Sequence, residues 1–222
     1  MAKPFELLVF DWDGTIMDSE VRIVNSFQAS IAELHLPPRT DQQIRFIIGL
    51  GLEESIQQLY PNEFNHQFAL DLIERYRQHF FSPTAVATPL FPNTAEILHE
   101  LVATGYQLAV ATGKSRRGLN EALQQTGLQE LFVTTRCAEE TFSKPHPLML
   151  QEILAELSVP AQAALMIGDT DYDVQMAINA GVAAAAVSYG VHEKAHLLAS
   201  NPLICFDNLS ELPVWLANQS EI

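Results

Sequence analysis

Short apolar runs alternate with helical segments from Pro89 onward, and this alternation limits the possible fold more than any other feature of the sequence. The runs cover residues 106–111, 131–134, 163–167, 182–187 and 203–206. Strands that alternate with helices form a parallel sheet that is covered by helices on both faces. The second half of the chain therefore predicts an α/β fold.

A further apolar run, residues 5–10, ends at Asp11-Trp12-Asp13-Gly14-Thr15. The run is too short for a typical helix and indicates a buried parallel strand. Ligand sites of open α/β sheets lie just beyond such strand ends. Two carboxylates at this position are costly unless a cation compensates their charge.

Residues 17–88 have a helical pattern with no convincing strand, and Thr40 to Gln43 fits a capping box. The first strand thus belongs with the residues after 88. We predict a core domain of residues 1–16 and 89–222 and an inserted, all-helical cap domain of residues 17–88. Such an insertion could be a lid over the strand ends, or it could only add stability, and the sequence leaves both readings open.

Composition excludes several classes of partner. The formal net charge of −15 disfavours nucleic acids and anionic membranes, because phosphate contacts require lysine and arginine. The sequence has no apolar run of about 18 residues and no export signal at its start, so we expect a cytoplasmic protein. Cys137 and Cys205 have no metal-ligand spacing, and we expect two inert thiols in a reducing compartment.

Polar residues follow the other predicted strands as well: Thr112 and Gly113, then Lys144 in a proline-rich turn, then Asp169 and Asp173. Each alone has an ordinary explanation as a helix cap, a solvated lysine or an acidic first turn. At one sheet edge, however, each close pair of carboxylates would repel by about 4 kcal/mol. A hard divalent cation would offset this repulsion, and oxygen ligands favour Mg²⁺ over zinc, for which we find no histidine or cysteine cluster.

The order Asp-x-Asp-Gly-Thr, Thr-Gly, Lys-Pro and Gly-Asp-x-x-x-Asp resembles the four motifs of the haloacid dehalogenase superfamily of phosphohydrolases. The resemblance spans nearly the whole chain. The helical insertion resembles the small cap of the phosphoglycolate phosphatase-like branch. The resemblance implies a Rossmann-like core, a Mg²⁺ cofactor and hydrolysis of a small phosphorylated metabolite such as phosphoglycolate or a sugar phosphate.

The resemblance also implies a role for each motif residue. Asp11 would attack phosphorus and form an aspartyl-phosphate, and Asp13 would be the general acid and base, kept neutral by closure of the lid. Thr112 and the Gly113 amide would bind the phosphoryl oxygens, and Lys144 would neutralise the nucleophile and the phosphoryl group. Mg²⁺ would be held by Asp11, the backbone carbonyl of Asp13, and Asp169, while Asp173 would orient metal-bound water or Lys144.

Other activities remain as alternatives. Asp13 argues against a dehalogenase, and Thr15 and Leu52 depart from the pattern of phosphosugar mutases. A pyrophosphatase of the same superfamily, a receiver-like signalling domain and a scaffold protein are further alternatives. The substrate is not determined, although Arg22 and Arg45 could read a second acidic group. The chain could be a monomer or a homodimer.

Overall fold

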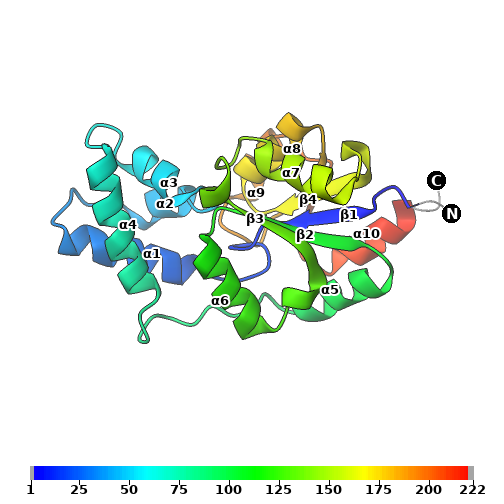
Figure 1. The fold of residues 1–222 in the computed structure, drawn as a ribbon, viewed down its shortest axis with the longest axis horizontal. Coiled ribbons are helices and arrows are strands. Elements are labelled where there is room, and N and C mark those ends of the chain that lie inside the picture. Colours follow the sequence, from blue (N-terminus) through cyan, green and yellow to red (C-terminus); the bar gives the residue numbers. More distant parts are fainter. Residues whose placement is uncertain (1–2, 220–222) are drawn as a thin grey trace.

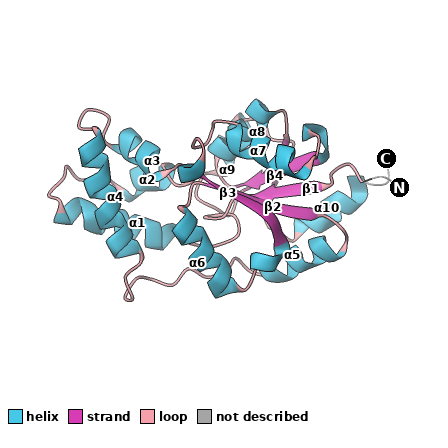
Figure 2. Cartoon of the chain, in the orientation of Figure 1, coloured by secondary structure: helices cyan, strands magenta, loops and turns pink. Residues whose placement is uncertain are grey.

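The protein has a parallel six-stranded sheet with helices on both faces, and a group of helices lies beyond one end of the sheet (Figures 1 and 2). The structure is a computed structural model and describes residues 3–219. The strand order is β3-β2-β1-β4-β5-β6. The strands are β1 (Leu7–Phe10), β2 (Gln107–Thr112), β3 (Phe132–Cys137), β4 (Ala164–Gly168), β5 (Ala183–Val187) and β6 (Ile204–Phe206).

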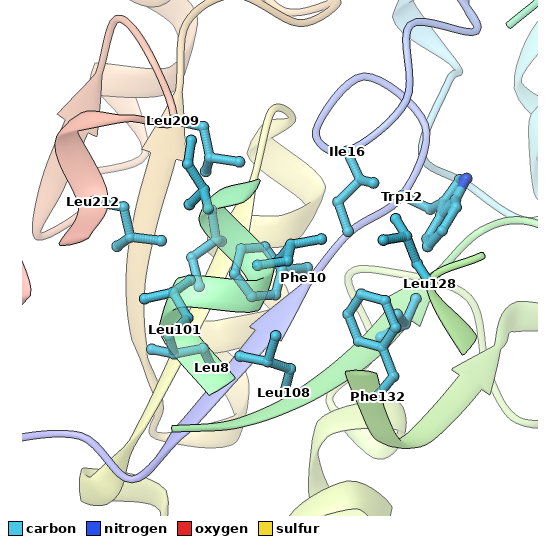
Figure 3. Packing of buried hydrophobic residues seen from close by; sticks show 14 of the residues in the cluster. Leu8, Phe10, Trp12, Ile16, Leu101, Leu108, Leu128, Phe132, Leu209 and Leu212 are labelled. Carbon is cyan, nitrogen blue, oxygen red and sulfur yellow. The ribbon is translucent and has the colours of Figure 1, made fainter. Parts of the chain in front are cut away.

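The side chains of β1 alternate between two cores because successive residues of a strand point to opposite faces. Leu8 and Phe10 belong to one core, shown in Figure 3, with α5 (Thr94–Ala103), α6 (Arg116–Thr126) and α10 (Glu211–Gln219). Leu7 and Val9 belong to the other, with α7 (Leu148–Leu157), α8 (Asp171–Ala180) and α9 (Lys194–Ala199). All four side chains are fully buried. Burial on both faces explains why this strand is continuously apolar.

The helical group has a hydrophobic core of its own and is inserted directly behind the first strand. Its helices are α1 (Glu20–Glu33), α2 (Asp41–Phe46), α3 (Leu52–Leu59) and α4 (His66–Phe80). Phe27 of α1 packs on Tyr76 of α4, with ring centroids 4.6 Å apart. We call residues 17–88 the helical segment, and its assignment as a separate cap domain stays a prediction.

The sequence predicts the elements well. Every expected strand is present within a few residues, and the capping box of α2 is formed by Thr40 and Gln43. Helix α2 ends at Phe46, and Gly49 lies in the following loop with φ at +101°. The described residues also form three short 3-10 helices: η1 (Gln129–Leu131), η2 (Ala138–Glu140) and η3 (Ala161–Ala163). None of the helices within residues 3–219 is long and apolar enough to cross a membrane.

Candidate active site

The first strand delivers Asp11 and Asp13 through a tight turn. The Asp11 amide still donates to the carbonyl of Ile167 in β4, so Asp11 continues the sheet. Gly14 then has φ at +89°, where a side chain is strained. A Cβ at this position would also lie 2.1 Å from Oδ2 of Asp169. The glycine of the first motif therefore allows the ends of β1 and β4 to approach each other.

Three carboxylates meet at this edge of the sheet. Oxygens of Asp11, Asp169 and Asp173 all lie within 4.8 Å of one another, and each of the three residues is at most 1% exposed. Asp169 is fixed by the Thr15 hydroxyl and the Val191 amide, each of which donates to it at 2.8 Å. The predicted convergence of the first and fourth motifs is present.

Lys144 lies among these carboxylates. Its Nζ is 2.7 Å from Oδ1 of Asp11 and 2.6 Å from Oδ1 of Asp173, and its side chain is fully buried. The other oxygen of Asp173 accepts from the Thr170 hydroxyl at 2.6 Å, which fixes the carboxylate. The sequence offered two partners for Asp173, and Lys144 is the one that the structure brings into contact with it.

The site is short of positive charge. Burial, together with Asp173 and Asp169, raises the pKa of Asp11 well above its usual range, although Lys144 opposes this. Burial and Asp173 raise the pKa of Asp169 to about 6. Burial lowers the pKa of Lys144, but the carboxylates outweigh it and raise the pKa above its ordinary value. The ammonium of Lys144 thus lies among three carboxylates, and a second cation would stabilise the cluster.

The oxygen atoms present fit a magnesium ion. Oδ2 of Asp11 is buried and accepts no hydrogen bond from any residue in the described part of the chain. Asp11 and Asp169 offer only oxygen ligands, which hard cations prefer. These two residues would hold Mg²⁺, which would supply Lewis-acid stabilisation of charge on a phosphoryl group.

Asp13 has partners other than those of the three clustered carboxylates. Its Oδ1 lies 2.7 Å from Nζ of Lys114 and its Oδ2 lies 2.9 Å from the same atom. The Ser19 hydroxyl also donates to Oδ1, at 2.6 Å. The expectation that closure of the lid keeps this acid neutral stays a prediction. Lys114 follows the second motif directly, and its ammonium reaches Asp13. No role for Lys114 is predicted from the sequence. Its position directly after Thr112-Gly113 is the feature of the sequence that could have placed it at the site.

The second motif is the place where the helical segment touches the sheet. Thr112 is 1% exposed, and its hydroxyl accepts from the Lys114 amide at 3.1 Å. A Cβ on Gly113 would lie 2.5 Å from the carbonyl oxygen of Gly49 and 2.4 Å from that of Leu50. Gly113 is therefore needed for close approach of the loop after α2, and the helical segment is closed over the strand ends.

A cavity between the two parts exposes Asp11 and Asp13 to a largely apolar wall. The helical segment contributes aliphatic and aromatic side chains to it: Ile23, Phe27, Ile47, Ile48, Leu50, Leu52, Tyr76, Phe80 and Phe81. Arg22 and Arg45 do not line it; Arg22 donates to the Phe80 carbonyl and Arg45 pairs with Glu20. Lys114 lines the cavity and is 7% exposed at its side chain, whereas Arg77 is 47% exposed and pairs with Glu139.

A second group of metal-ligand residues corrects the sequence analysis. No histidine cluster was expected, yet His192, His196 and Asp171 bring ligand atoms within 4.8 Å of one another. The sequence hides this cluster because Asp171 is more than twenty positions before the two histidines in a different element. None of its members belongs to the magnesium candidates.

Comparison with known proteins identifies the family. Residues 8–187 match the haloacid dehalogenase-like hydrolase family. The chain belongs to this family. The predicted resemblance, the Rossmann-like α/β fold and the expectation of an enzyme are therefore confirmed, and this haloacid dehalogenase-like hydrolase carries all four motifs at the predicted edge of its sheet.

Curated relatives of this hydrolase have several names. Probable phosphatase IndB of Dickeya dadantii is 32% identical over 93% of this chain and 91% of the relative. Phosphoglycolate phosphatase of Vibrio parahaemolyticus is 30% identical over 95% of each chain. Pyrophosphatase PpaX of Bacillus cereus is 28% identical over 96% of this chain and 97% of the relative.

The fold also matches solved structures. A haloacid dehalogenase-like hydrolase of Bacteroides fragilis superposes with a TM-score of 0.86 at 25% identity, over 94% of this chain and 99% of the other. Agreement over whole chains indicates that the helical segment is part of the shared architecture.

Proposed function

We propose that this hydrolase is a Mg²⁺-dependent phosphatase in which Asp11 is the nucleophile. The proposal rests on the position of Asp11, which lines the cavity at a strand end and whose buried Oδ2 lacks a hydrogen-bond partner among the described residues. Lys144 holds the other oxygen of the same carboxylate at 2.7 Å. This arrangement fixes the carboxylate and leaves one oxygen free to attack.

Attack of Oδ2 on phosphorus would break the bond to the leaving oxygen and form an aspartyl-phosphate, which splits a difficult hydrolysis into two easier steps. Asp13 would donate a proton to the leaving oxygen and later accept one from the attacking water. For the first of these steps Asp13 must carry a proton, so its contact with Lys114 has to be released. Thr112 and the Gly113 amide would bind the phosphoryl oxygens.

Lys114 bears on the choice of substrate. A leaving group with its own negative charge could take the place of the Asp13 carboxylate at Nζ and thereby free Asp13. The names of the relatives include two substrates of this kind, phosphoglycolate and pyrophosphate. We therefore propose a small phosphate compound whose leaving group carries a second anionic group, in preference to a sugar phosphate, whose leaving group is neutral.

A substrate screen tests the proposal. Purified protein is assayed with p-nitrophenyl phosphate, phosphoglycolate, pyrophosphate and glucose phosphates, with Mg²⁺ and then with a chelator. We expect turnover that depends on Mg²⁺ and is abolished in Asp11→Asn, which keeps the shape of the side chain. Hydrolysis that survives chelation or the substitution would reject the proposed nucleophile and cofactor.

A further inference from the structure

Asp171, His192 and His196 lie together outside the catalytic centre. Asp171 is the first residue of α8, His192 lies in the loop after β5, and His196 is in α9. Nδ1 of His192 lies 3.0 Å from Oδ1 of Asp171, and Nε2 of His196 lies 3.2 Å from Oδ2. Asp171 is 7% exposed and His192 is 4% exposed. Two imidazoles and one carboxylate therefore converge from three separate segments.

The hydrogen bonds of His192 define its tautomer. Nε2 lies 3.3 Å from the carbonyl oxygen of Phe46, which can only accept, so this nitrogen carries the hydrogen. Nδ1 accepts the Asp171 amide at 3.2 Å. The lone pair of Nδ1 thus accepts the Asp171 backbone amide, and a metal ion on Nδ1 would take the place of this hydrogen bond; the assignment follows from the hydrogen-bond network.

One oxygen of the Asp171 carboxylate accepts a hydrogen bond and the other lacks one among the described residues. Its Oδ1 is buried and receives no hydrogen bond of ordinary geometry within residues 3–219, although Nδ1 of His192 is so close. Its Oδ2 accepts from the Gln175 amide group at 3.1 Å. Two acceptor atoms that face each other across 3.0 Å need either a hydrogen on Nδ1 or a metal ion between them.

The surrounding contacts are those typical of metal ligands. A ligating histidine usually donates its other nitrogen to a carbonyl or carboxylate, and a ligating carboxylate is itself hydrogen-bonded. His192 has such a contact with Phe46, and Asp171 has one with Gln175. The side chain of His196 is 44% exposed, which leaves an entry path for an ion.

We propose that Asp171, His192 and His196 form a binding site for a divalent transition-metal ion of the zinc type, with water in a fourth position. Imidazole nitrogens select such ions over Mg²⁺, and small rotations bring three ligands within the roughly 2.0–2.2 Å that zinc requires. The site shares no residue with the proposed magnesium centre. Without the ion, Asp171 raises the pKa of His192 against the opposing effect of burial, so a proton competes with the metal.

The position of the site connects it with the helical segment. The Phe46 ring stacks on the His192 ring with centroids 5.1 Å apart, and the Phe46 carbonyl also accepts from the Tyr172 hydroxyl at 3.0 Å. A metal on Nδ1 keeps the hydrogen on Nε2, which donates to this carbonyl. The proposed site therefore lies where the helical segment contacts the core.

The test measures metal binding directly and does not depend on phosphatase activity. Metal-stripped protein is titrated with Co²⁺ or Zn²⁺; bound metal is counted by equilibrium dialysis and elemental analysis, and Co²⁺ ligation is followed by visible absorption. Wild type is compared with His196→Ala and His192→Ala. His99→Ala, at an exposed histidine of α5, is the matched control, and Asp11→Asn reports on the catalytic carboxylates.

With the catalytic carboxylates saturated by excess Mg²⁺, we expect one Co²⁺ or Zn²⁺ ion per chain in wild type, in the control and in Asp11→Asn. In His196→Ala we expect an affinity lowered by about 10-fold or more, on the scale of ligand-shell mutations. His196 is half exposed, so its variant carries the test even if His192→Ala does not fold. Equal binding by His196→Ala and wild type, or binding lost only in Asp11→Asn, would overturn the proposal. Either result would leave the proposed phosphatase function unaffected.

Discussion

Replacement of Lys144 by methionine tests whether the acidic cluster depends on this one cation. Nζ lies 2.7 Å from Asp11 and 2.6 Å from Asp173, which corresponds to about 6 kcal/mol for each pair at an effective dielectric constant of 20. Desolvation of the ammonium, which methionine does not require, offsets part of this attraction. Removal of one partner from a buried ion pair costs about 3–5 kcal/mol, and we expect a loss of this size in the free energy of unfolding.

Urea denaturation at neutral pH with a chelator measures the effect. Lys194→Met is the matched control, because Lys194 pairs with Asp207 on the surface, where solvent screens the charges. The loss in Lys144→Met should shrink at lower pH, where the carboxylates are protonated, and also on addition of Asp173→Asn. A change of less than about 1 kcal/mol, or one no larger than in the control, would refute the reasoning.

Three further predictions concern the same site. Burial raises the pKa of Asp169 to about 6, so the contribution of its proton to stability is complete below about pH 4 and is lost as pH rises through 6. Urea denaturation of the metal-free protein at several pH values should show a loss of about 3 kcal/mol in the free energy of unfolding over this range. The loss should be absent in Asp169→Asn. Gly113→Ala places a Cβ 2.5 Å from the Gly49 carbonyl oxygen, so it should lower the free energy of unfolding by about 1–3 kcal/mol and reduce kcat/KM. Unchanged values of both quantities would contradict the close contact. Lys114→Met should reduce kcat/KM for pyrophosphate or phosphoglycolate at least about 10-fold more than for p-nitrophenyl phosphate, because a charged hydrogen bond contributes about 1.5–3 kcal/mol. An equal reduction for both kinds of substrate would show that Lys114 does not determine substrate preference.

The fold could be predicted because its signals are local. The β1 strand is apolar on both faces, so residues 7–10 indicate a central strand without knowledge of its neighbours. The motif residues could be placed together because the carboxyl ends of parallel strands share one edge. Asp11 and Asp169 follow adjacent strands, β1 and β4, and therefore meet.

The remaining features depend on side-chain reach and on contacts between distant elements. Lys114 could have faced solvent, and only the closed helical segment encloses it with Asp13 and Phe80. The histidine cluster needs the packing of α9 beside α8, which no periodicity in the sequence reports. In both cases the sequence shows the residue type but does not show which residue it contacts.

The central claim is that the carboxylate of Asp11 carries the phosphoryl group during turnover. The most direct measurement is rapid acid quenching of the protein during hydrolysis of a good substrate with Mg²⁺, followed by peptide mass mapping of the acyl phosphate. Asp13→Asn, in which breakdown of the intermediate should be slow, would raise its yield. We predict phosphate on the peptide that contains Asp11 and none in Asp11→Asn; turnover without a phosphorylated Asp11, or phosphate on another residue, would contradict the account.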